Sequence, residues 1–466
     1  MLTALAHPIT NLIPNPGTAP QNSLHDPAAT RRPGPPRLFF RSRPPTFHHP
    51  PNHRQQPPGT RRQSPYHPPM TSQSHPENPK TTDTAQRPTI AVSMGDPGGI
   101  GPEVTLKALA DPNRRAAARW IIYGSQSALI NAANLASINP FWWRTTPESA
   151  LAPTASAHQV LLIDRDQSRP PETGNWRHEP TRDGGLASFT YIEDALADAA
   201  RTLRSRDHPH APPQSTPDCL GAHLHIDAIT TAPISKEAWS LAGKAKWPGH
   251  TELLADRLNA KDARMIFVSP LLIVALATTH IPLTQVADQL SLGRVLTTIE
   301  QAHRTCQNLG IKEPRIAVTG LNPHAGEQGI LGADEERVIT PAINHAKRQG
   351  IQATGPHPAD TVFSAALRHS NHDLPKAPRR HDAVVAMYHD QGLVPVKLLG
   401  FDQAVNLTAG LPTPRTSPDH GTAFDIAHNG AANPGSMAAA LDLAVKLAMN
   451  TPTTANNPNT HRTQTA

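Results

Sequence analysis

The chain has 466 residues, including 51 prolines and 28 glycines, with 43 Lys and Arg against 37 Asp and Glu. At about 150 residues per domain, this length predicts two or three domains with a large buried core. The 2 cysteines, Cys219 and Cys306, are too few for a disulfide framework or a cysteine zinc cluster, which favours the reducing cytoplasm. No run of about 18 apolar residues is present, which excludes a membrane-spanning helix.

The first 88 residues differ in composition from the rest of the chain. They hold 20 of the 51 prolines and carry 10 Lys and Arg against 3 Asp and Glu. Because the whole chain has a net charge of +6, this excess of 7 positive charges leaves the remainder near −1. The main body therefore gives no support to nucleic-acid binding. Dense proline removes backbone donors and fixes φ, so we expect residues 1–87 to be a disordered extension.

This leader has no amphipathic pattern and no signal-type apolar core, which argues against a targeting peptide or a nucleic-acid arm. A sharper hypothesis is that translation starts at Met70, shortly before ordered sequence begins, which mass spectrometry of the native N-terminus would test. The polar residues 451–466 are expected to form a disordered tail.

Apolar runs alternate with amphipathic stretches from Pro88 onward. The first run, 89–94, leads through a glycine-rich turn into a helix from about Pro102, because proline suits a first helical turn. The later strand-like runs are 120–124, 159–163, 226–234, 263–269, 271–280, 315–321 and 382–389. The clearest helical stretches are 188–205, 292–310 and 335–350. This alternation predicts an α/β fold with a substantially parallel sheet.

About 360 ordered residues are too many for one ordinary sheet, so we expect two lobes with a cleft. We expect a first α/β lobe from residues 88–230 together with 410–450, and a second from 231–409 that carries most of the metal and substrate residues. Residues 208–223 and 368–381 are typical of surface loop insertions.

Three histidines follow apolar runs: His280 in LATTHIPL, His324 in GLNPHAGE and His389 in AMYHDQG. In α/β sheets, ligands bind outside the carboxyl ends of the strands, where loops and helix N-termini converge. One such histidine is usually structural, but three in equivalent positions favour a shared metal ion. Neutral imidazoles suit Zn²⁺ or Co²⁺, and three protein ligands leave positions open for substrate.

Other side chains suit an anionic, hydroxylated substrate. His250 and Thr251 lie at a turn that enters a predicted helix, where donors to an anion are available. Lys397, Asn406 and Arg415 follow one another at nine-residue intervals, and such cations suggest phosphate or carboxylate binding. The alternative role for either cation alone is ordinary surface charge.

Two carboxylates are candidates for acid–base chemistry. Asp360 lies in GPHPADTVF, and Asp390 directly follows His389. Asp390 has the alternative role of capping the next turn.

The glycine-rich GDPGGIGPE at 95–103 is placed like a phosphate-binding turn, between a predicted strand and a predicted helix. Two prolines depart from the GxGxxG pattern, and no clear acidic residue ends a second strand about 20 residues on. The alternative is that Gly98, Gly99 and Gly101 permit a tight turn against a neighbouring lobe.

Eight motifs together carry a family resemblance: SMGDPGGIGPE, TAPISKEAW, GHTELLA, ALATTHIPL, GLNPHAGE, GPHPADTVF, AMYHDQGLVPVK and GLPTPRTSPDHGTA. They occur in the order found in the 4-hydroxythreonine-4-phosphate dehydrogenases of pyridoxal phosphate biosynthesis. The chain resembles that family over residues 88–450, and the leader is unmatched.

The resemblance implies oxidation of 4-phosphooxy-L-threonine by NAD or NADP, giving 2-amino-3-oxo-4-(phosphooxy)butanoate, which decarboxylates to 3-amino-2-oxopropyl phosphate. It also implies a cytoplasmic homodimer with a shared active site, and a fold similar to isocitrate and isopropylmalate dehydrogenases. One divalent ion per subunit (Zn, Mg or Co) would be held by His280, His324 and His389 from both chains. The substrate-binding positions implied are His250, Thr251, Lys397, Asn406 and Arg415.

The motifs leave alternatives open. A paralogous dehydrogenase of D-threonate or D-erythronate 4-phosphate would use the same apparatus. Metal-dependent acyl or phosphoryl transfer is a second alternative, and nucleic-acid binding through the leader is a third, against which the near-neutral body argues. The sequence does not choose NAD over NADP, or one divalent metal over another.

Overall fold

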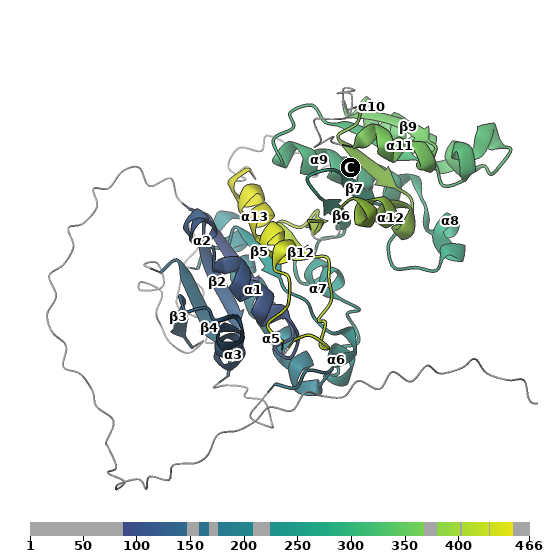
Figure 1. Ribbon diagram of the computed structural model, residues 1–466. Helices are drawn as coiled ribbons and strands as arrows, with labels where there is room; N and C mark the ends of the chain where they lie inside the picture. Colours follow the sequence, from purple (N-terminus) through teal and green to yellow (C-terminus); the bar gives the residue numbers. More distant parts are fainter. Residues whose placement is uncertain are drawn as a thin grey trace, which may run out of the picture. The chain divides into compact units, whose positions relative to one another are not determined.

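The computed structural model describes residues 87–146, 158–166, 176–207, 224–367, 380–400, 403–427 and 429–450 (Figure 1). Several predictions lie outside these residues: the leader with Met70, the tail 451–466, Cys219, and nearly all of the two loop insertions. Cys306 is buried and forms no disulfide in the described part of the chain. The described helices include none that is long and apolar enough to cross a membrane.

The described strands form one twelve-stranded sheet in the order β3-β4-β2-β1-β5-β12-β11-β6-β7-β10-β8-β9. Pairing is parallel from β3 to β12 and again from β7 to β9, and antiparallel between β12 and β7. The predicted α/β class with a substantially parallel sheet is confirmed. The strands are β1 Thr89–Ser93, β2 Arg119–Gly124, β3 Trp143–Thr145, β4 Val160–Asp164, β5 Ala228–Thr231, β6 Arg264–Val268, β7 Ile273–Leu276, β8 Arg315–Thr319, β9 Gln352–His357, β10 Ala383–Ala386, β11 Val405–Ala409 and β12 Arg415–Pro418.

The helices agree with the predicted helical stretches, and α1 carries its proline in the first turn. Local capping explains several boundaries: α9, for example, begins after Ser291, whose hydroxyl accepts a hydrogen bond from the Arg294 N–H. The helices are α1 Gly101–Leu109, α2 Pro112–Ala117, α3 Gln126–Ala136, α5 Arg182–Asp207, α6 Lys236–Leu241, α7 His250–Arg257, α8 Val286–Gln289, α9 Leu292–Asn308, α10 Thr340–Arg348, α11 Ala359–Ala366, α12 His389–Gly400 and α13 Gly435–Asn450, with the short turns η1 Leu283–Gln285, η2 Pro323–Gly329 and η3 Glu335–Ile339.

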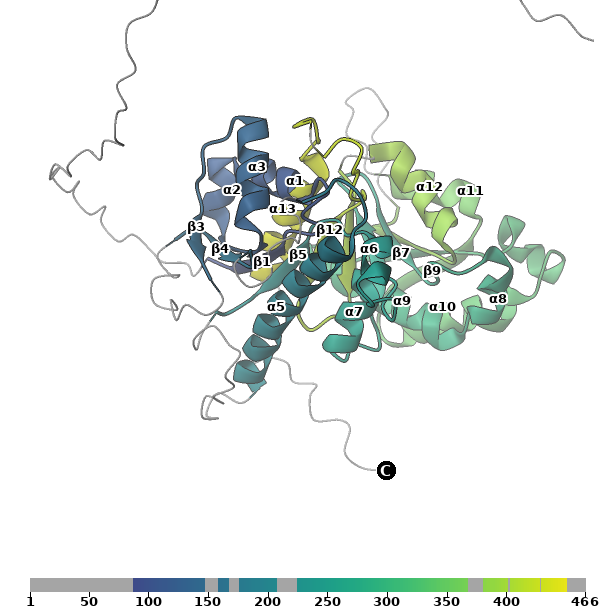
Figure 2. The ribbon, with the colours of Figure 1, turned by 90° about the horizontal axis from the view of Figure 1, so that it is seen from below.

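Buried apolar side chains lie on both faces of the sheet. In β7, Ile273 and Ala275 belong to one cluster with α9 and α10, whereas Val274 and Leu276 belong to another with α11 and α12. This is the alternation expected of a strand covered on both faces. A further cluster joins β1, β2, β4 and β5 to α1, α5 and α13. Helix α13 lies beside α1 (Figures 1 and 2) and also contributes side chains to the α9–α10 cluster.

The glycine-rich turn after β1 is packed closely against the loop that follows β12. A Cβ at Gly99 would lie 2.8 Å from the Thr422 carbonyl oxygen. The Ile100 N–H donates to that same oxygen at 2.8 Å, and the Gly98 and Gly99 N–H groups donate to Asp96. Because these N–H groups already have partners inside the protein, the turn fits the tight-packing interpretation better than a phosphate cradle.

Asp96 makes the stability of the fold depend on pH. The side chain is buried, and burial raises its pKa from 3.8 to about 7, against a smaller opposing effect of the Gly98 N–H. Between these two values the native state binds more protons than the unfolded state, so stability falls as the pH rises from 4 to 7. The expected loss is up to about 4 kcal/mol.

Asp96→Asn is therefore expected to remove most of this loss. Urea unfolding at pH 5, 6, 7 and 8 measures the change, with the unmutated chain as reference. Equal pH slopes for the two proteins would show that Asp96 is ionised across the whole range.

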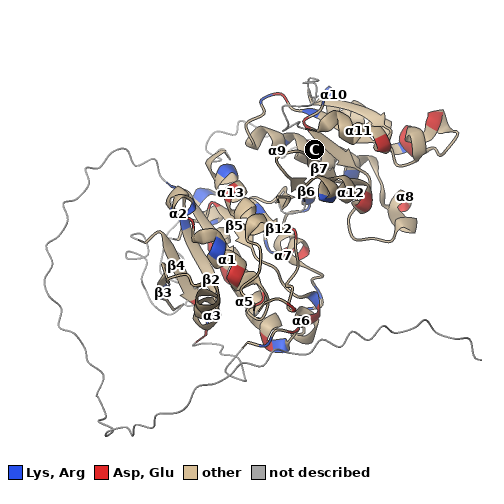
Figure 3. Cartoon of the chain, viewed as in Figure 1, with Lys and Arg blue, Asp and Glu red and all other residues tan. Residues whose placement is uncertain are grey.

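Charges of both signs are mixed over the described elements, as the view in Figure 3 shows. No element in this view carries a long row of Lys or Arg alone. This pattern agrees with the near-neutral body predicted from the sequence and differs from the basic stripe of a nucleic-acid-binding domain.

Candidate functional site

Arg415 is the most unusual charged residue of the sheet. It begins β12, directly opposite Thr408 in β11, and is only 2% exposed. Its guanidinium donates from Nε (3.0 Å) and Nη2 (2.6 Å) to Thr231 Oγ1 on β5, and from Nη1 (3.1 Å) to Thr408 Oγ1. All of these hydrogen bonds go to neutral hydroxyls.

Burial lowers the pKa of Arg415 to about 9, and Glu252 partly opposes this shift. The guanidinium is therefore still charged at neutral pH, and no carboxylate of the described ranges is bonded to it. A buried cation in such surroundings is costly for the folded state unless an anion joins it. Arg415 is thus arranged as a receptor for an anionic group.

Asn406 lies on the same face of the sheet as this cation. It is two residues before Thr408 in β11, and alternate residues of a strand point to one face. Its Oδ1 atom is buried and has no hydrogen-bond partner among the described residues. Buried polar atoms are usually satisfied, so this atom is suited to a donor on a bound molecule.

His250 and Thr251 form the first turn of α7, directly after the buried Gly249. The His250 Nε2 atom is also buried, with no hydrogen-bond partner in the described part of the chain, and its ring meets the Trp239 ring edge-on with centroids 5.8 Å apart. Burial, together with the charges of Arg415 and Lys236, holds the pKa of His250 well below its usual value. The imidazole is therefore neutral at pH 7.

His280 and His389 lie close together, with ring centroids 5.5 Å apart. They follow β7 and β10, which are parallel neighbours in the sheet. The segments after these strands remain joined, because Thr278 donates to the Met387 carbonyl oxygen through both its N–H and its hydroxyl. The sheet therefore explains why two histidines more than a hundred residues apart in sequence meet.

His324 does not complete a three-ligand group within one chain. The described residues contain no cluster of three or more His, Cys, Asp or Glu side chains that could hold a metal ion. The predicted site of His280, His324 and His389 thus has two of its members together. The third member remains a prediction.

His324 lies in an unusual left-handed turn. The backbone φ angle is positive for His324, Ala325, Gly326, Glu327 and Gln328 in succession. Non-glycine residues adopt this region at a cost of about 1–2 kcal/mol each, so other contacts must hold the turn. Such strain is typical of functional loops.

The buried Glu335 holds this turn in place. Its Oε1 accepts hydrogen bonds from the Leu321 and Asn322 N–H groups, both at 2.8 Å, and its Oε2 accepts one from Asn322 Nδ2 at 3.0 Å. Glu335→Gln replaces an acceptor by a donor, so we expect a loss of about 1–3 kcal/mol in unfolding free energy and weaker metal binding. Urea unfolding and metal titration measure both, with the exposed neighbour substitution Glu336→Gln as the control. Equal effects of the two variants would contradict the role given to Glu335.

Three further predicted residues, Lys397, Asp390 and Asp360, differ in their contacts. Lys397 on α12 forms an ion pair with Asp419, Nζ to Oδ2 at 2.6 Å. Asp390 Oδ1 lies 2.7 Å from His389 Nδ1 and can orient that ring. Asp360 is exposed in the first turn of α11.

Sequence reasoning missed several residues of this site: Thr231, Thr408, Lys236, Glu252 and Asp419. Burial is the largest cause of the lowered pKa values of His250, His280 and Arg415. The charge of Lys236 adds to this lowering for His250 and His280, and the charge of Glu252 partly opposes it for His280 and Arg415. These two charges therefore act on Arg415 and His250 and also on His280. TAPISKEAW and GHTELLA contain Thr231, Lys236 and Glu252, so the motifs carried the signal.

The fold and these buried polar groups define an α/β protein with a candidate anion-binding site among β5, β11 and β12. A sequence profile described as "Pyridoxal phosphate biosynthetic protein PdxA" matches residues 219–444. The "4-hydroxythreonine-4-phosphate dehydrogenase" of Desulforapulum autotrophicum is 38% identical over 362 residues, covering 78% of this chain and 96% of that protein. The "D-threonate 4-phosphate dehydrogenase" of Cupriavidus necator is 41% identical over 363 residues, covering 78% and 97%.

A crystal structure of 4-hydroxythreonine-4-phosphate dehydrogenase from Klebsiella pneumoniae aligns with a TM-score of 0.62 and 38% identity, covering 78% of this chain and 99% of that chain. These similarities extend over most of the described residues. The chain belongs to the PdxA family, and the resemblance found in its motifs is confirmed.

Proposed function

We propose that this chain is an NAD- or NADP-dependent dehydrogenase that oxidises 4-phosphooxy-L-threonine to 2-amino-3-oxo-4-(phosphooxy)butanoate. The product is a β-keto acid, so its ketone accepts the electrons released when CO₂ leaves and 3-amino-2-oxopropyl phosphate forms. This compound is a precursor of pyridoxine 5'-phosphate. Family membership and the activity named for the Desulforapulum autotrophicum relative support the proposal.

The observation that carries the proposal is the buried Arg415. A guanidinium that has only hydroxyl partners, near the unsatisfied Asn406 Oδ1 and His250 Nε2 atoms, suits a substrate with anionic and hydroxyl groups. Both the phosphate and the carboxylate of the proposed substrate have this chemistry.

Oxidation at C3 requires loss of the hydroxyl proton as the hydride departs. Arg415 and Lys397 would hold the anionic groups of the substrate, and His250, Thr251 and Asn406 would orient its hydroxyl and amino groups. Asp360 or Asp390 would accept the C3 hydroxyl proton. The nicotinamide ring supplies the hydride acceptor when it is bound.

A divalent metal ion fits the histidine pair. Burial and nearby positive charge lower the pKa of His280, so this ring is a neutral nitrogen donor, and His389 lies beside it. Zn²⁺, Co²⁺ or Mg²⁺ held by His280, His389 and a third histidine would supply Lewis acidity at the C3 oxygen.

The third ligand leads to the proposal of a homodimer with a shared active site. A second copy of the chain would bring its own His324 to the pair. Large apolar side chains are exposed on the elements that carry these histidines: Ile330 (79%) follows the turn that carries His324, and Leu398 (81%) lies on α12, which begins at His389. A subunit interface would cover such side chains.

We further propose two lobes, 88–230 with 410–450 and 231–409, arranged as in isocitrate and isopropylmalate dehydrogenases, in a cytoplasmic enzyme. The separate apolar clusters on either side of β12 support two lobes. Side chains of α6 and α7 join the first cluster, and side chains of α13 contribute to both clusters. Neither a membrane nor a nucleic acid is a proposed partner.

A second candidate is oxidation of D-threonate or D-erythronate 4-phosphate. The relative from Cupriavidus necator favours it, since that protein is named as a D-threonate 4-phosphate dehydrogenase and is 41% identical. These substrates have a hydroxyl where 4-phosphooxy-L-threonine has an amino group, and they keep the phosphate and the carboxylate.

The test is NADH or NADPH formation by the chelated and metal-reloaded protein on each substrate. We expect turnover of 4-phosphooxy-L-threonine only after metal is restored. Preferred turnover of D-threonate 4-phosphate would support the second candidate. Absence of turnover on every phosphorylated substrate would contradict both.

A further inference from the structure

Trp239 packs directly against a candidate substrate residue. It lies on α6, is only 1% exposed, and its ring meets the His250 ring edge-on, with the two planes at 89°. The His250 Nε2 atom has no hydrogen-bond partner among the described residues that would fix where it points. The direction of this atom therefore depends on how the imidazole ring is packed.

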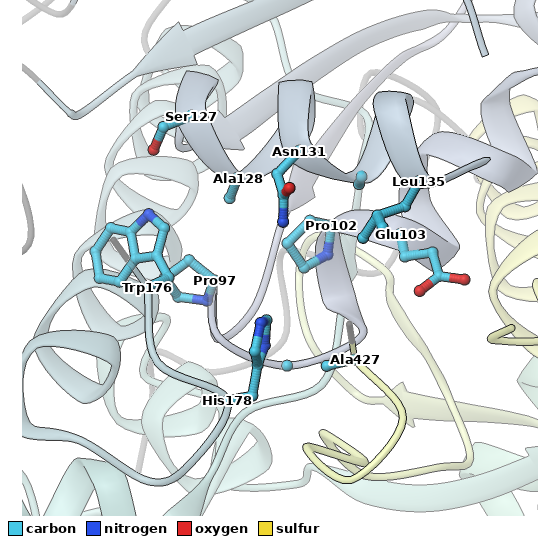
Figure 4. A pocket seen from close by; sticks show the side chains of 12 residues that line it. Pro97, Pro102, Glu103, Ser127, Ala128, Asn131, Leu135, Trp176, His178 and Ala427 are labelled. Atoms are coloured by element: carbon cyan, nitrogen blue, oxygen red, sulfur yellow. The ribbon is translucent and has the colours of Figure 1, made fainter. Parts of the chain in front are cut away.

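The other tryptophans have different surroundings. Within the described ranges, Trp239 is the one whose ring packs against a candidate histidine. Trp120 is buried in the core on β2, and its Nε1 donates to the Arg115 carbonyl oxygen at 3.2 Å. Trp176 borders a cavity of about 340 Å³ that none of the candidate substrate or metal residues lines (Figure 4). The position beside His250 is thus particular to Trp239.

Helix α5 holds the Trp239 ring in place. The helices α5 and α6 lie side by side (Figures 1 and 2). Trp239 Nε1 donates to Ser188 Oγ at 3.1 Å, and this hydroxyl donates in turn to the Gly185 carbonyl oxygen at 3.2 Å. The Phe189 ring meets the indole at 76°, with centroids 5.3 Å apart. The hydrogen bond and the aromatic contact together restrict the indole to one orientation.

The backbones of α5 and α6 approach closely at Gly185. A Cβ at this position would collide with the carbonyl oxygen of Ala238, the residue before Trp239. Helix α6 is also fixed at its start, because the Ser235 hydroxyl accepts a hydrogen bond from the Ala238 N–H at 3.1 Å. A ring carried by a helix so constrained is in position before substrate binds, which lowers the entropy cost of binding.

The segment that carries Trp239 also holds Arg415. Thr231, at the end of β5, accepts two hydrogen bonds from the guanidinium, and Trp239 follows on the next helix, α6. After burial, the charge of Arg415 is the largest cause of the lowered pKa of His250, so the guanidinium and the imidazole lie near each other. One short stretch of chain therefore sets both the position of the buried cation and the orientation of the neighbouring ring.

We propose that Trp239 is a positioning residue for the reaction, holding the His250 imidazole so that its Nε2 atom faces a substrate bound at Arg415. The inference rests on the proposed function, in which His250 orients the hydroxyl and amino groups of the substrate. Without the indole beside it, the imidazole gains freedom to turn away from the substrate. Misplacement of an orienting group by about 1 Å can lower the rate about 100-fold.

Steady-state kinetics of Trp239→Leu is the first test. This variant is expected to lower kcat about 10–100-fold with little change in KM, because Arg415 still holds the anionic groups of the substrate. For the same reason, inorganic phosphate should raise its Tm as it does for the unmutated chain. Trp239→Phe keeps an aromatic ring against His250 and loses only the hydrogen bond to Ser188, so it should recover kcat to within about fivefold of normal.

A double-mutant cycle tests whether Trp239 acts through His250. Trp239→Leu should lower kcat about 10–100-fold when His250 is present, and less than about twofold in the His250→Ala background. If Trp239→Leu does not fold, Ser188→Ala gives the same comparison, because it frees the indole N–H and leaves every ring in place. Ser188→Ala is expected to lower kcat about threefold, again only when His250 is present.

Trp120→Leu is the matched control, because Trp120 is an equally buried tryptophan whose indole N–H also has a partner. It should lower Tm at least as much as Trp239→Leu does and leave kcat within about twofold of normal. A normal kcat for Trp239→Leu, or equal falls in kcat with and without His250, overturns the positioning role. If the unmutated chain oxidises a phosphorylated substrate, only this inference then fails; if it oxidises none, the proposed function fails as well.

Discussion

Arg415→Met is expected to lower kcat/KM for the phosphorylated substrate by about 10²–10³-fold without lowering the unfolding free energy. The loss of activity follows from removing the buried cation that would bind an anionic group of the substrate. Stability behaves differently, because burial on folding lowers the pKa of Arg415 to about 9. Below pH 9 the group is charged in both the native and the unfolded state, so the full cost of burying the charge opposes folding at neutral pH.

Methionine removes that cost, which the shift sets at roughly 4–5 kcal/mol. The Thr231 and Thr408 hydroxyls then lose a partner, at a cost of about 1 kcal/mol each. The net change in unfolding free energy is therefore zero or positive. Urea unfolding of the protein without substrate, together with steady-state kinetics, measures the two effects separately.

Arg264→Met is the control for Arg415→Met. Arg264 lies on β6, is half-buried, and also donates to a threonine hydroxyl, Thr298 Oγ1 at 3.2 Å. The Arg264→Met substitution should leave kcat/KM nearly unchanged. Inorganic phosphate should still raise the Tm of this variant, whereas it should no longer raise the Tm of the Arg415→Met variant. A clear drop in stability for Arg415→Met with normal phosphate binding would mean that Arg415 is only structural.

The part of the site that could be predicted from sequence depends on parallel strands. The apolar runs before His280 and His389 indicated β7 and β10, and parallel neighbours end at the same edge of a sheet. The observed ring distance of 5.5 Å follows from this geometry. The strand-like run 271–280 was predicted too long, because β7 ends at Leu276 and the rest forms the loop that carries His280.

The surroundings of Arg415 could not be predicted in this way. Strands β11 and β12 have the sequences VNLTA and RTSP, which lack the apolar run that marks a buried strand. Their antiparallel pairing places Arg415 opposite Thr408, and the parallel pairing of β12 with β5 brings in Thr231 from 184 residues away. Surface charge was therefore a reasonable alternative for Arg415 until the sheet order was known.

His324→Ala and His389→Ala are each expected to lose nearly all metal-dependent turnover, yet a mixture of the two should recover about a quarter of normal activity. In a mixed dimer, one site keeps His280 and His389 from one chain and His324 from the other, so one of two sites is intact. Random exchange after co-expression makes half of the dimers mixed. Mixing His280→Ala with His389→Ala should recover nothing, because both residues belong to the same chain's half of each site. Recovered activity in that control mixture would contradict the shared site. So would a first mixture that recovers no activity although light scattering shows that it is dimeric. Full activity of His324→Ala under chelation would contradict the metal role.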